Sequence, residues 1–175
     1  GSMHLCAPEV GMMGASAIVA STIPHAVGAA MATRIVGQDH IVAAFYGEGA
    51  TGEGVYHESL NIAATKRAPL LLVCENNDLA IYTRVRDTHA FEVLPHARSY
   101  GIPGVQVQQG WDIERVAQAA AAAVDHVRTH RSPYVLEVQT CRYLQHVGPD
   151  DDLDLGYRDA AAVDAWKKRD PLIQD

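Results

Sequence analysis

The feature that most constrains the fold is the alternation of short apolar runs with segments of helical character. The runs "HIVAAFYG" (40–47) and "APLLLVCEN" (68–76) lack polar alternation, as strands buried on both faces of a parallel sheet do. Two further runs, 104–109 and 132–140, also favour strands. Helices alternating with strands at this spacing predict an α/β fold, with a mostly parallel, doubly wound sheet and helices on both faces.

The segments around these runs predict the helices. Pro24 suits a first helical turn, Asp112 is a favourable N-cap, and Pro95 interrupts an otherwise helical stretch. The predicted helices cover residues 22–37, 53–66, 88–100, 112–128 and 160–169. Residues 146–159 predict an acidic loop, and we expect Asp150, Asp151 and Asp152 to lie in solvent.

Composition bounds the class of protein. A chain of 175 residues suits one domain, and we expect residues 1–175 to form a single one. The net charge of −7 argues against nucleic acid or a membrane surface as partner, and no run reaches the length of a membrane span. The cysteines Cys6, Cys74 and Cys141 lie far apart, which is typical of reduced thiols in a cytoplasmic protein.

Polar residues follow two of the predicted strands. Glu48 comes directly after the first strand, between Gly47 and Gly49, and Asn77 follows the second. Ligands of doubly wound sheets sit beyond the carboxyl ends of the strands, so both side chains can face one crevice. Carboxylate and amide oxygens suit magnesium, and glycines before a helix N-terminus suit phosphate. A diphosphate bridged by magnesium fits these parts.

The two halves together carry a resemblance to a known family. Gly47-Glu48-Gly49, 26 residues and Asn76-Asn77 resemble the thiamine-diphosphate motif, whose usual form begins Gly-Asp-Gly. The stretches "GSMHL", "GASAIVASTIPHAVGAA", "GEGATGEGVYHESLNIAATKRAP", "CENN" and "RYLQHVGP" are similar to the alpha subunit of the decarboxylating component of 2-oxoacid (pyruvate or branched-chain) dehydrogenase complexes, or to acetoin dehydrogenase. The resemblance implies the thiamine diphosphate-binding fold, specifically its pyrophosphate-binding domain.

The resemblance implies a metal site made of three residues. Glu48 takes the place of the aspartate that ligates Mg²⁺, Asn77 that of the amide ligand, and Leu79 that of a main-chain carbonyl ligand. Glu48 is one methylene longer than aspartate, and Mg²⁺ demands near-octahedral geometry. We therefore expect the turn to absorb the extra length, or the metal site to be weaker.

The resemblance also implies contacts with the cofactor. Gly49 and Ala50 would face the diphosphate through backbone groups, and Ala17 and Val19 match positions near the pyrimidine end. His146 matches a histidine at the mouth of the active site, where a protonatable group would serve acyl transfer to a lipoyl disulfide.

Partners follow from the resemblance as well. The glutamate that activates the aminopyrimidine belongs to the beta subunit in this family, so we expect activity only with a beta-type partner and weak or no cofactor binding by this chain alone. A lipoyl or other carrier protein would accept the product. The family carries a segment ahead of "GSMHL" that this chain lacks, so another polypeptide would supply it, or the chain is a split or trimmed form.

Two alternatives stay open at this point. The chain could be half of a split transketolase-like enzyme that transfers a two-carbon unit. It could also be a non-catalytic family remnant that keeps the fold for assembly, which the change from Gly-Asp-Gly to Gly-Glu-Gly would favour. Substrate, acyl acceptor and oligomeric state do not follow from the sequence.

Overall fold

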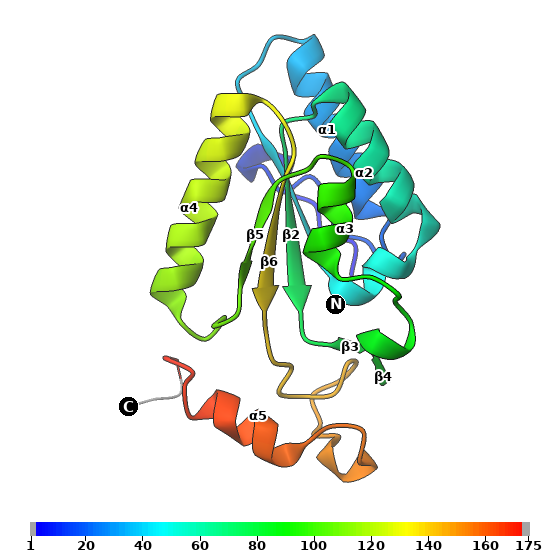
Figure 1. The fold of residues 1–175 in the computed structure, drawn as a ribbon, viewed down its shortest axis with the longest axis vertical. Coiled ribbons are helices and arrows are strands. Elements are labelled where there is room, and N and C mark those ends of the chain that lie inside the picture. The colour runs from blue at the N-terminus through cyan, green and yellow to red at the C-terminus, as the bar shows by residue number, and fades with distance from the viewer. Residues whose placement is uncertain (1–2, 173–175) are drawn as a thin grey trace.

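A computed structural model of the chain describes residues 3–172. Its central layer is a sheet of four parallel strands in the order β1-β2-β6-β5. The strands are β1 (Val42–Gly47), β2 (Leu70–Asn76), β5 (Gly104–Val107) and β6 (Tyr134–Gln139). The helices are α1 (Thr22–Ile35), α2 (Gly54–Lys66), α3 (Val93–Ser99), α4 (Ile113–His130) and α5 (Ala160–Lys167). The predicted fold class is confirmed (Figure 1).

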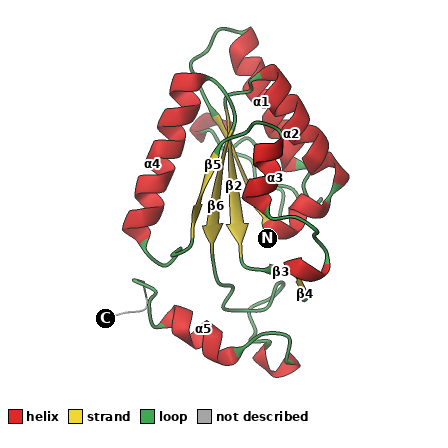
Figure 2. Ribbon diagram, viewed as in Figure 1, coloured by secondary structure: helices red, strands yellow, loops and turns green. Residues whose placement is uncertain are grey.

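Helices cover both faces of the sheet. Figures 1 and 2 show α1, α2 and α3 on one side of the strands and α4 on the other, with α5 beyond the strands' carboxyl ends. One core cluster joins α1, α2 and α3 to the first face, and a second joins α4 to the opposite face. The first cluster includes Ile23, Tyr56, Leu60, Leu70 and Leu72, and the second includes Val73, Ala123, Val127, Leu136 and Val138. The apolar runs of β2 and β6 are therefore buried on both faces, as predicted, whereas the prediction is wrong for β1, one face of which is exposed.

The predicted helices differ from the observed ones mainly at their ends. Pro95 is the third residue of α3, where a backbone N–H has no helical partner to lose, so the helix begins just before the proline instead of breaking at it. The Asp112 side chain accepts a hydrogen bond from the N–H of Arg115 and caps α4, as predicted. No helix among residues 3–172 is both long and apolar enough to cross a bilayer.

The sequence analysis missed a short hairpin. Strands β3 (Leu79–Ala80) and β4 (Thr83–Arg84) pair antiparallel directly after the Asn76-Asn77 turn. Short 3-10 turns η1 (Pro8–Val10), η2 (Glu48–Gly52), η3 (Val85–Asp87) and η4 (Leu153–Leu155) complete the assignment. Two-residue strands carry too little pattern to be seen in a sequence.

Strand β1 forms one edge of the sheet. Phe45 lies in register with Val73 and Leu136, which belong to the α4 side, but α4 packs on β2, β5 and β6. The Phe45 side chain is consequently 64% exposed, whereas Ala44 and Tyr46 on the opposite face are buried. One face of β1 and one row of its backbone groups therefore remain uncovered by residues 3–172.

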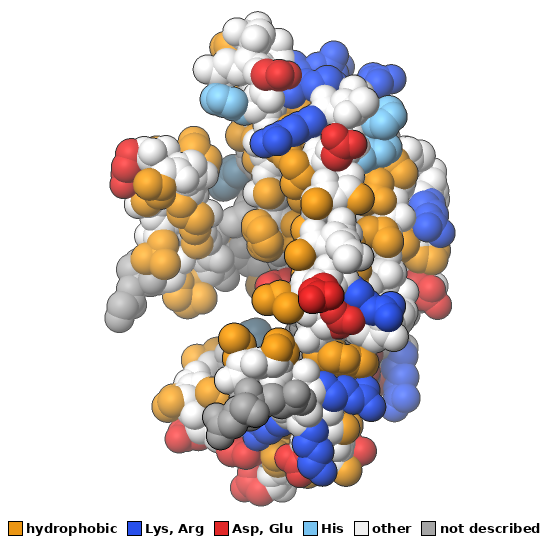
Figure 3. Space-filling view, turned by 90° about the vertical axis from the view of Figure 1, so that its left-hand side faces the viewer, with side chains coloured by type: hydrophobic (Ala, Val, Ile, Leu, Met, Phe, Trp, Pro, Cys, Tyr) orange, Lys and Arg blue, Asp and Glu red, His pale blue; other side chains and the backbone are white. Residues whose placement is uncertain are grey.

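The segment ahead of α1 is an irregular arm with many exposed apolar side chains. The exposed large hydrophobic residues of this arm are Met3, Leu5, Val10, Met12, Met13, Ile18 and Val19. Figure 3 shows hydrophobic side chains gathered on the lobe that carries the arm, and the surface is hollowed between this lobe and the lobe that carries α5.

Candidate functional site

Strands β1 and β2 are neighbours, which brings the two predicted metal ligands to one edge of the sheet. Gly47, the last residue of β1, lies in register with Glu75 near the end of β2. Glu48 then opens the 3-10 turn η2, and Asn77 follows the last residue of β2. The predicted juxtaposition at the carboxyl edge is present.

The Glu48 carboxylate binds the backbone of the turn that follows β2. Its Oε2 accepts a hydrogen bond from the N–H of Asn77 at 3.0 Å, and its Oε1 accepts one from the N–H of Leu79 at 2.6 Å. The side chain is fully buried. Burial raises the pKa of Glu48 above its usual value, although both N–H groups act in the opposite direction. The longer side chain is thus accommodated by capping two amides at once.

Asn77 presents a buried oxygen that has no partner. Its side-chain Oδ1 is shielded from solvent and makes no hydrogen bond with any residue that the structure describes. A buried acceptor without a partner is costly, and a cation beside it would satisfy it. The two Glu48 oxygens accept backbone N–H groups and keep further lone pairs. Hard oxygen donors of this kind fit Mg²⁺.

A site built from histidine, cysteine and carboxylates does not occur here. Within residues 3–172, no three such side chains lie close enough together to hold a metal ion. The donor set at the sheet edge is one carboxylate, one amide and the backbone of Leu79, which is 7% exposed. This composition excludes the soft-ligand geometry of structural zinc in the described chain and agrees with a few-ligand magnesium site.

Gly49 is required by close packing. A Cβ at Gly49 would lie 2.8 Å from the Cβ of Ala80, because η2 runs directly against the hairpin strand β3. The neighbouring Ala50 is buried, and the Thr51 hydroxyl donates to the carbonyl of Glu48 at 2.7 Å. The turn predicted to face a diphosphate is therefore held rigidly between β1 and the hairpin.

The remaining predicted cofactor contacts lie outside this cluster. Ala17 and Val19 sit on the exposed arm just ahead of α1. His146 is exposed in the loop after β6. For these three residues the structure gives positions but no contact with Glu48 or Asn77 among the described hydrogen bonds. Their assigned roles stay predictions, and the first two residues of "GSMHL" lie outside the described residues.

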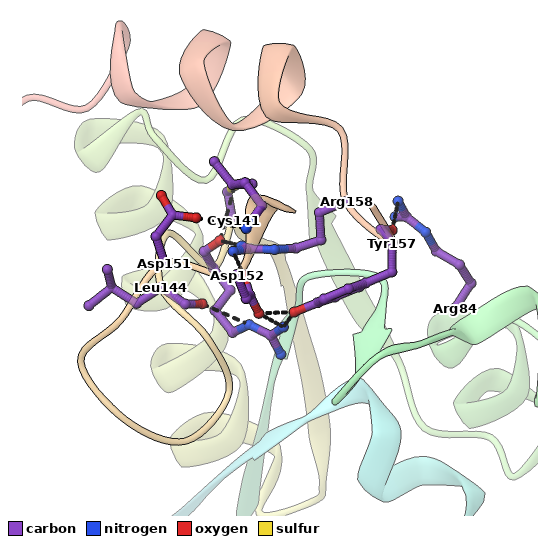
Figure 4. A network of polar contacts seen from close by, with 9 residues as sticks. Arg84, Cys141, Leu144, Asp151, Asp152, Tyr157 and Arg158 are labelled. Carbon is purple, nitrogen blue, oxygen red and sulfur yellow. Dashed lines mark hydrogen bonds and ion pairs between the residues drawn. The ribbon is translucent and has the colours of Figure 1, made fainter. Parts of the chain in front are cut away.

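The acidic loop before α5 contains a buried ion cluster, which the sequence analysis did not foresee. Asp152 accepts hydrogen bonds from Tyr157 and Arg158 and pairs with Arg142, whose Nη2 lies 3.6 Å away (Figure 4). The expectation that Asp152 lies in solvent is wrong, since the residue is 2% exposed. Burial acts to raise its pKa, but the hydrogen bonds and the two guanidinium charges lower it overall.

This cluster ties the loop that carries His146 to the rest of the site. Arg142 also donates to the carbonyl of Leu144 at 3.1 Å and to the Tyr157 hydroxyl at 2.6 Å. Arg84 of the hairpin reaches the carbonyl of Tyr157 at 3.3 Å. The sequence does contain a signal for this cluster: "YR" at 157–158 follows the aspartate run within a few residues, and the hydroxyl of Tyr157 and the guanidinium of Arg158 can both donate to a buried carboxylate.

A second unforeseen cluster lies between α2 and α3. The Nδ1 of His57 and the Nε2 of His96 are 2.8 Å apart, and Phe91 packs against both rings. Burial, and then the proximity of His57, lower the pKa of His96. A shallow cleft of about 770 Å³ beside the hairpin is lined in part by His89, Phe91 and His96. Glu48 and Asn77 do not line it, but Asp78 of the same turn does, so the cleft adjoins the candidate metal site.

The chain is similar in sequence to several known proteins. A protein-family model described as "Dehydrogenase E1 component" matches residues 1–175. The chain is 34% identical over 174 residues to the pyruvate dehydrogenase E1 component subunit alpha of Rickettsia felis, covering 99% of this chain and 52% of that protein. It is 36% identical over 159 residues to the 2-oxoisovalerate dehydrogenase subunit alpha of Bacillus subtilis, covering 90% of this chain and 47% of that one.

Solved structures agree on the fold. A transketolase mutant from Pichia stipitis, in complex with a sugar phosphate, superposes with a TM-score of 0.64 at 22% identity, over 72% of this chain and 20% of that one. The chain spans about half the length of the curated relatives it matches.

Proposed function

Because the chain belongs to the dehydrogenase E1 component family, we propose that it acts as the alpha-type part of a thiamine diphosphate-dependent 2-oxoacid or acetoin dehydrogenase. Its reaction would decarboxylate or cleave the substrate and pass the acyl unit to a lipoyl carrier. The observation that carries the proposal is the buried Glu48 carboxylate at the sheet edge, which accepts the N–H of Asn77, a residue whose side-chain Oδ1 is buried and unpartnered.

Three residues would hold the metal in this proposal. Glu48 and Asn77 would contribute side-chain oxygens, and Leu79 its carbonyl, with the metal in turn bound to the diphosphate. The Glu48 carboxylate is fully buried and has no counter-ion among the described residues. Its burial is the main reason why its pKa is raised. A divalent cation would stabilise the ionised form of Glu48, and the ionised carboxylate would in turn favour binding of the cation at neutral pH.

Other residues would contact the cofactor through the backbone. Gly49 and Ala50 would present main-chain groups to the diphosphate, and Ala17 and Val19 would lie toward the pyrimidine end. Thiamine diphosphate, when bound, supplies the electron sink for cleaving a bond next to a keto group. The chain's own contribution is to orient and anchor the diphosphate end and to exclude water there. The exposed His146 would hold a proton at the mouth for transfer to the acceptor.

The proposal includes partners. We expect a beta-type subunit to supply the group that activates the aminopyrimidine, and a lipoyl or other carrier protein to take the acyl unit. The exposed apolar side chains on the arm, such as Met13 and Val19, support a contact surface on that side of the molecule.

A split transketolase-like enzyme is the second candidate. The observation in its favour is the superposition on a transketolase, but a likeness at 22% identity concerns the fold alone. The curated relatives are dehydrogenase subunits, so the dehydrogenase is the better-supported function. A non-catalytic family remnant would keep the same fold and would bind no cofactor.

The test is calorimetric titration of thiamine diphosphate with Mg²⁺ into the chain, alone and with a candidate beta-type subunit. We expect binding only with the partner, retained in Glu48→Asp and lost in Asn77→Ala. Glu48→Ala is a less specific variant because it also removes two hydrogen bonds to the turn. Absence of binding in every combination would refute the catalytic proposal and favour the remnant.

A further inference from the structure

Strand β6 carries a buried carboxylate that none of the functions above uses. Glu137 is 2% exposed and lies in register with Cys74, facing the core between the sheet and α1 to α3. Its Oε2 makes no hydrogen bond within the described part of the chain. Burying a carboxylate costs folding free energy, so the one hydrogen bond that the Glu137 side chain makes within the described chain indicates a role for this residue.

That contact is with the first asparagine of the Asn76-Asn77 pair. The side-chain Nδ2 of Asn76 donates to Oε1 of Glu137 at 2.7 Å. A carboxylate accepts and does not donate, so it fixes which end of the Asn76 amide faces β6. The amide oxygen must then point the other way, and there it accepts from the N–H of Asp78 at 3.0 Å. Glu137 thereby sets the orientation of a side chain that bridges the turn.

The turn held in this way is strained. Asp78 has a φ of +64°, in the left-handed region that non-glycine residues adopt at a cost. This bend lets the N–H groups of Asn77 and Leu79 converge on Glu48. The turn is therefore clamped by Glu48 on one side and, through Asn76, by Glu137 on the other. The N–H of Thr140, just after β6, adds a bond to the carbonyl of Asn76 at 2.7 Å.

We propose that Glu137 is a positioning residue for the metal site: through Asn76 it holds the turn so that Asn77 Oδ1 and the Leu79 carbonyl face the cation. This inference rests on the proposed function only for the identity of the ligand. The clamp itself is a property of the chain without any ligand. Residues that orient metal ligands in this way commonly change metal affinity 10- to 100-fold when removed.

The first test needs no cofactor. Hydrogen exchange is measured at the amides of Asn77, Asp78 and Leu79 in the wild-type chain and in Glu137→Leu and Glu137→Gln. Leucine is of similar size but cannot accept a hydrogen bond, so we expect faster exchange at these amides and little change in α4. Glutamine keeps an acceptor oxygen, so we expect exchange close to that of the wild type. The matched control is Glu75→Gln, because Glu75 is an exposed carboxylate one strand away.

The second test measures metal binding. Mn²⁺ is titrated into the chain together with the beta-type subunit and thiamine diphosphate, and the free ion is followed by its paramagnetic signal. We expect an affinity loss of about 10-fold or more in Glu137→Leu, and of less than about 3-fold in Glu137→Gln. If the wild-type complex binds no metal, the proposed function fails while the exchange result still stands. If the wild type binds and Glu137→Leu binds equally well, the positioning role is wrong.

A second variant covers the case in which Glu137→Leu does not fold. Asn76→Ala removes the other end of the same hydrogen bond from a partly exposed strand end, where folding is less at risk. We expect it to speed hydrogen exchange at the same amides. Unchanged exchange at Asn77 and Leu79 in Asn76→Ala would overturn the proposal.

Discussion

Gly49→Ala tests the rigid contact between η2 and the hairpin. An ordinary contact begins at 3.4 Å, but the added methyl carbon would lie 2.8 Å from the Cβ of Ala80 and 3.3 Å from its Cα. One of the two segments must therefore move by about 0.6 Å. The Ala80 atoms are a methyl and the backbone, so no flexible side chain can yield. Overpacking of this kind costs about 1–3 kcal/mol of the free energy of unfolding.

The same shift would reach the candidate metal site. Moving η2 away from β3 lengthens the 2.6 Å bond between the Leu79 N–H and Glu48, which lies next to the substituted position. Stability is measured from urea denaturation followed by circular dichroism, with the midpoint and slope compared between variants. We expect Gly49→Ala to lower the midpoint at an unchanged slope.

Two further variants test whether the clash with Ala80 is the cause of the lost stability. Gly47 has a φ of −79° and no atom within 4 Å of an added Cβ, so Gly47→Ala should change stability by no more than about 0.5 kcal/mol. Ala80→Gly removes the nearest clashing atom and should recover most of the loss when combined with Gly49→Ala. If Gly49→Ala is as mild as Gly47→Ala, or if Ala80→Gly gives no recovery, the packing argument is wrong.

Three other predictions concern the clusters outside the metal site. Because the pKa of His96 is lowered in the folded state, stability should be full above pH 6.5 and should fall as the pH drops below it, and His96→Gln should flatten that profile in urea midpoints. Trp166 of α5 packs edge-on against Trp111, with the ring centroids 4.7 Å apart. Trp166→Ala should therefore weaken the docking of α5 by about 0.5–1.5 kcal/mol, in addition to the loss from its buried apolar area. Protease cleavage in α5 should become faster, while the unfolding of the sheet stays unchanged. Asp152→Asn should open the 142–158 loop to trypsin at neutral pH, and the wild-type loop should become open to pepsin only in acid strong enough to protonate Asp152, because that carboxyl has a lowered pKa.

The fold class was predictable from apolar runs that alternate with helical segments, although only β2 and β6 are buried on both faces and β1 is exposed on one. Apolar runs such as 68–76, alternating with helical segments, predicted the parallel arrangement of the strands, but they did not predict the strand order β1-β2-β6-β5. Glu48 and Asn77 could share one crevice only if β1 and β2 were neighbours, and the structure shows that they are. The hairpin at 79–84 was not, since its strands are too short to show a period.

The sequence offered Glu48 and Asn77 as candidate site residues, but it did not indicate the hydrogen bonds that they make. Glu48 was expected to point at a metal, and nothing in its position along the chain indicated that its carboxylate also caps two backbone amides. The contact of His57 with His96 joins residues 39 positions apart, and that of Asn76 with Glu137 joins residues 61 apart. Such contacts depend on how helices and strands pack, which local sequence patterns do not encode.

The uncovered edge of β1 has a consequence for handling the protein. Its sequence, "VAAFYG", contains no proline and no charged residue, the two kinds of residue that protect edge strands from pairing with another molecule. With Phe45 exposed beside open backbone groups, the strand offers a template for intermolecular sheet growth. The chain expressed by itself should therefore self-associate as its concentration rises, and Phe45→Lys should raise its solubility without disturbing the buried face of the sheet.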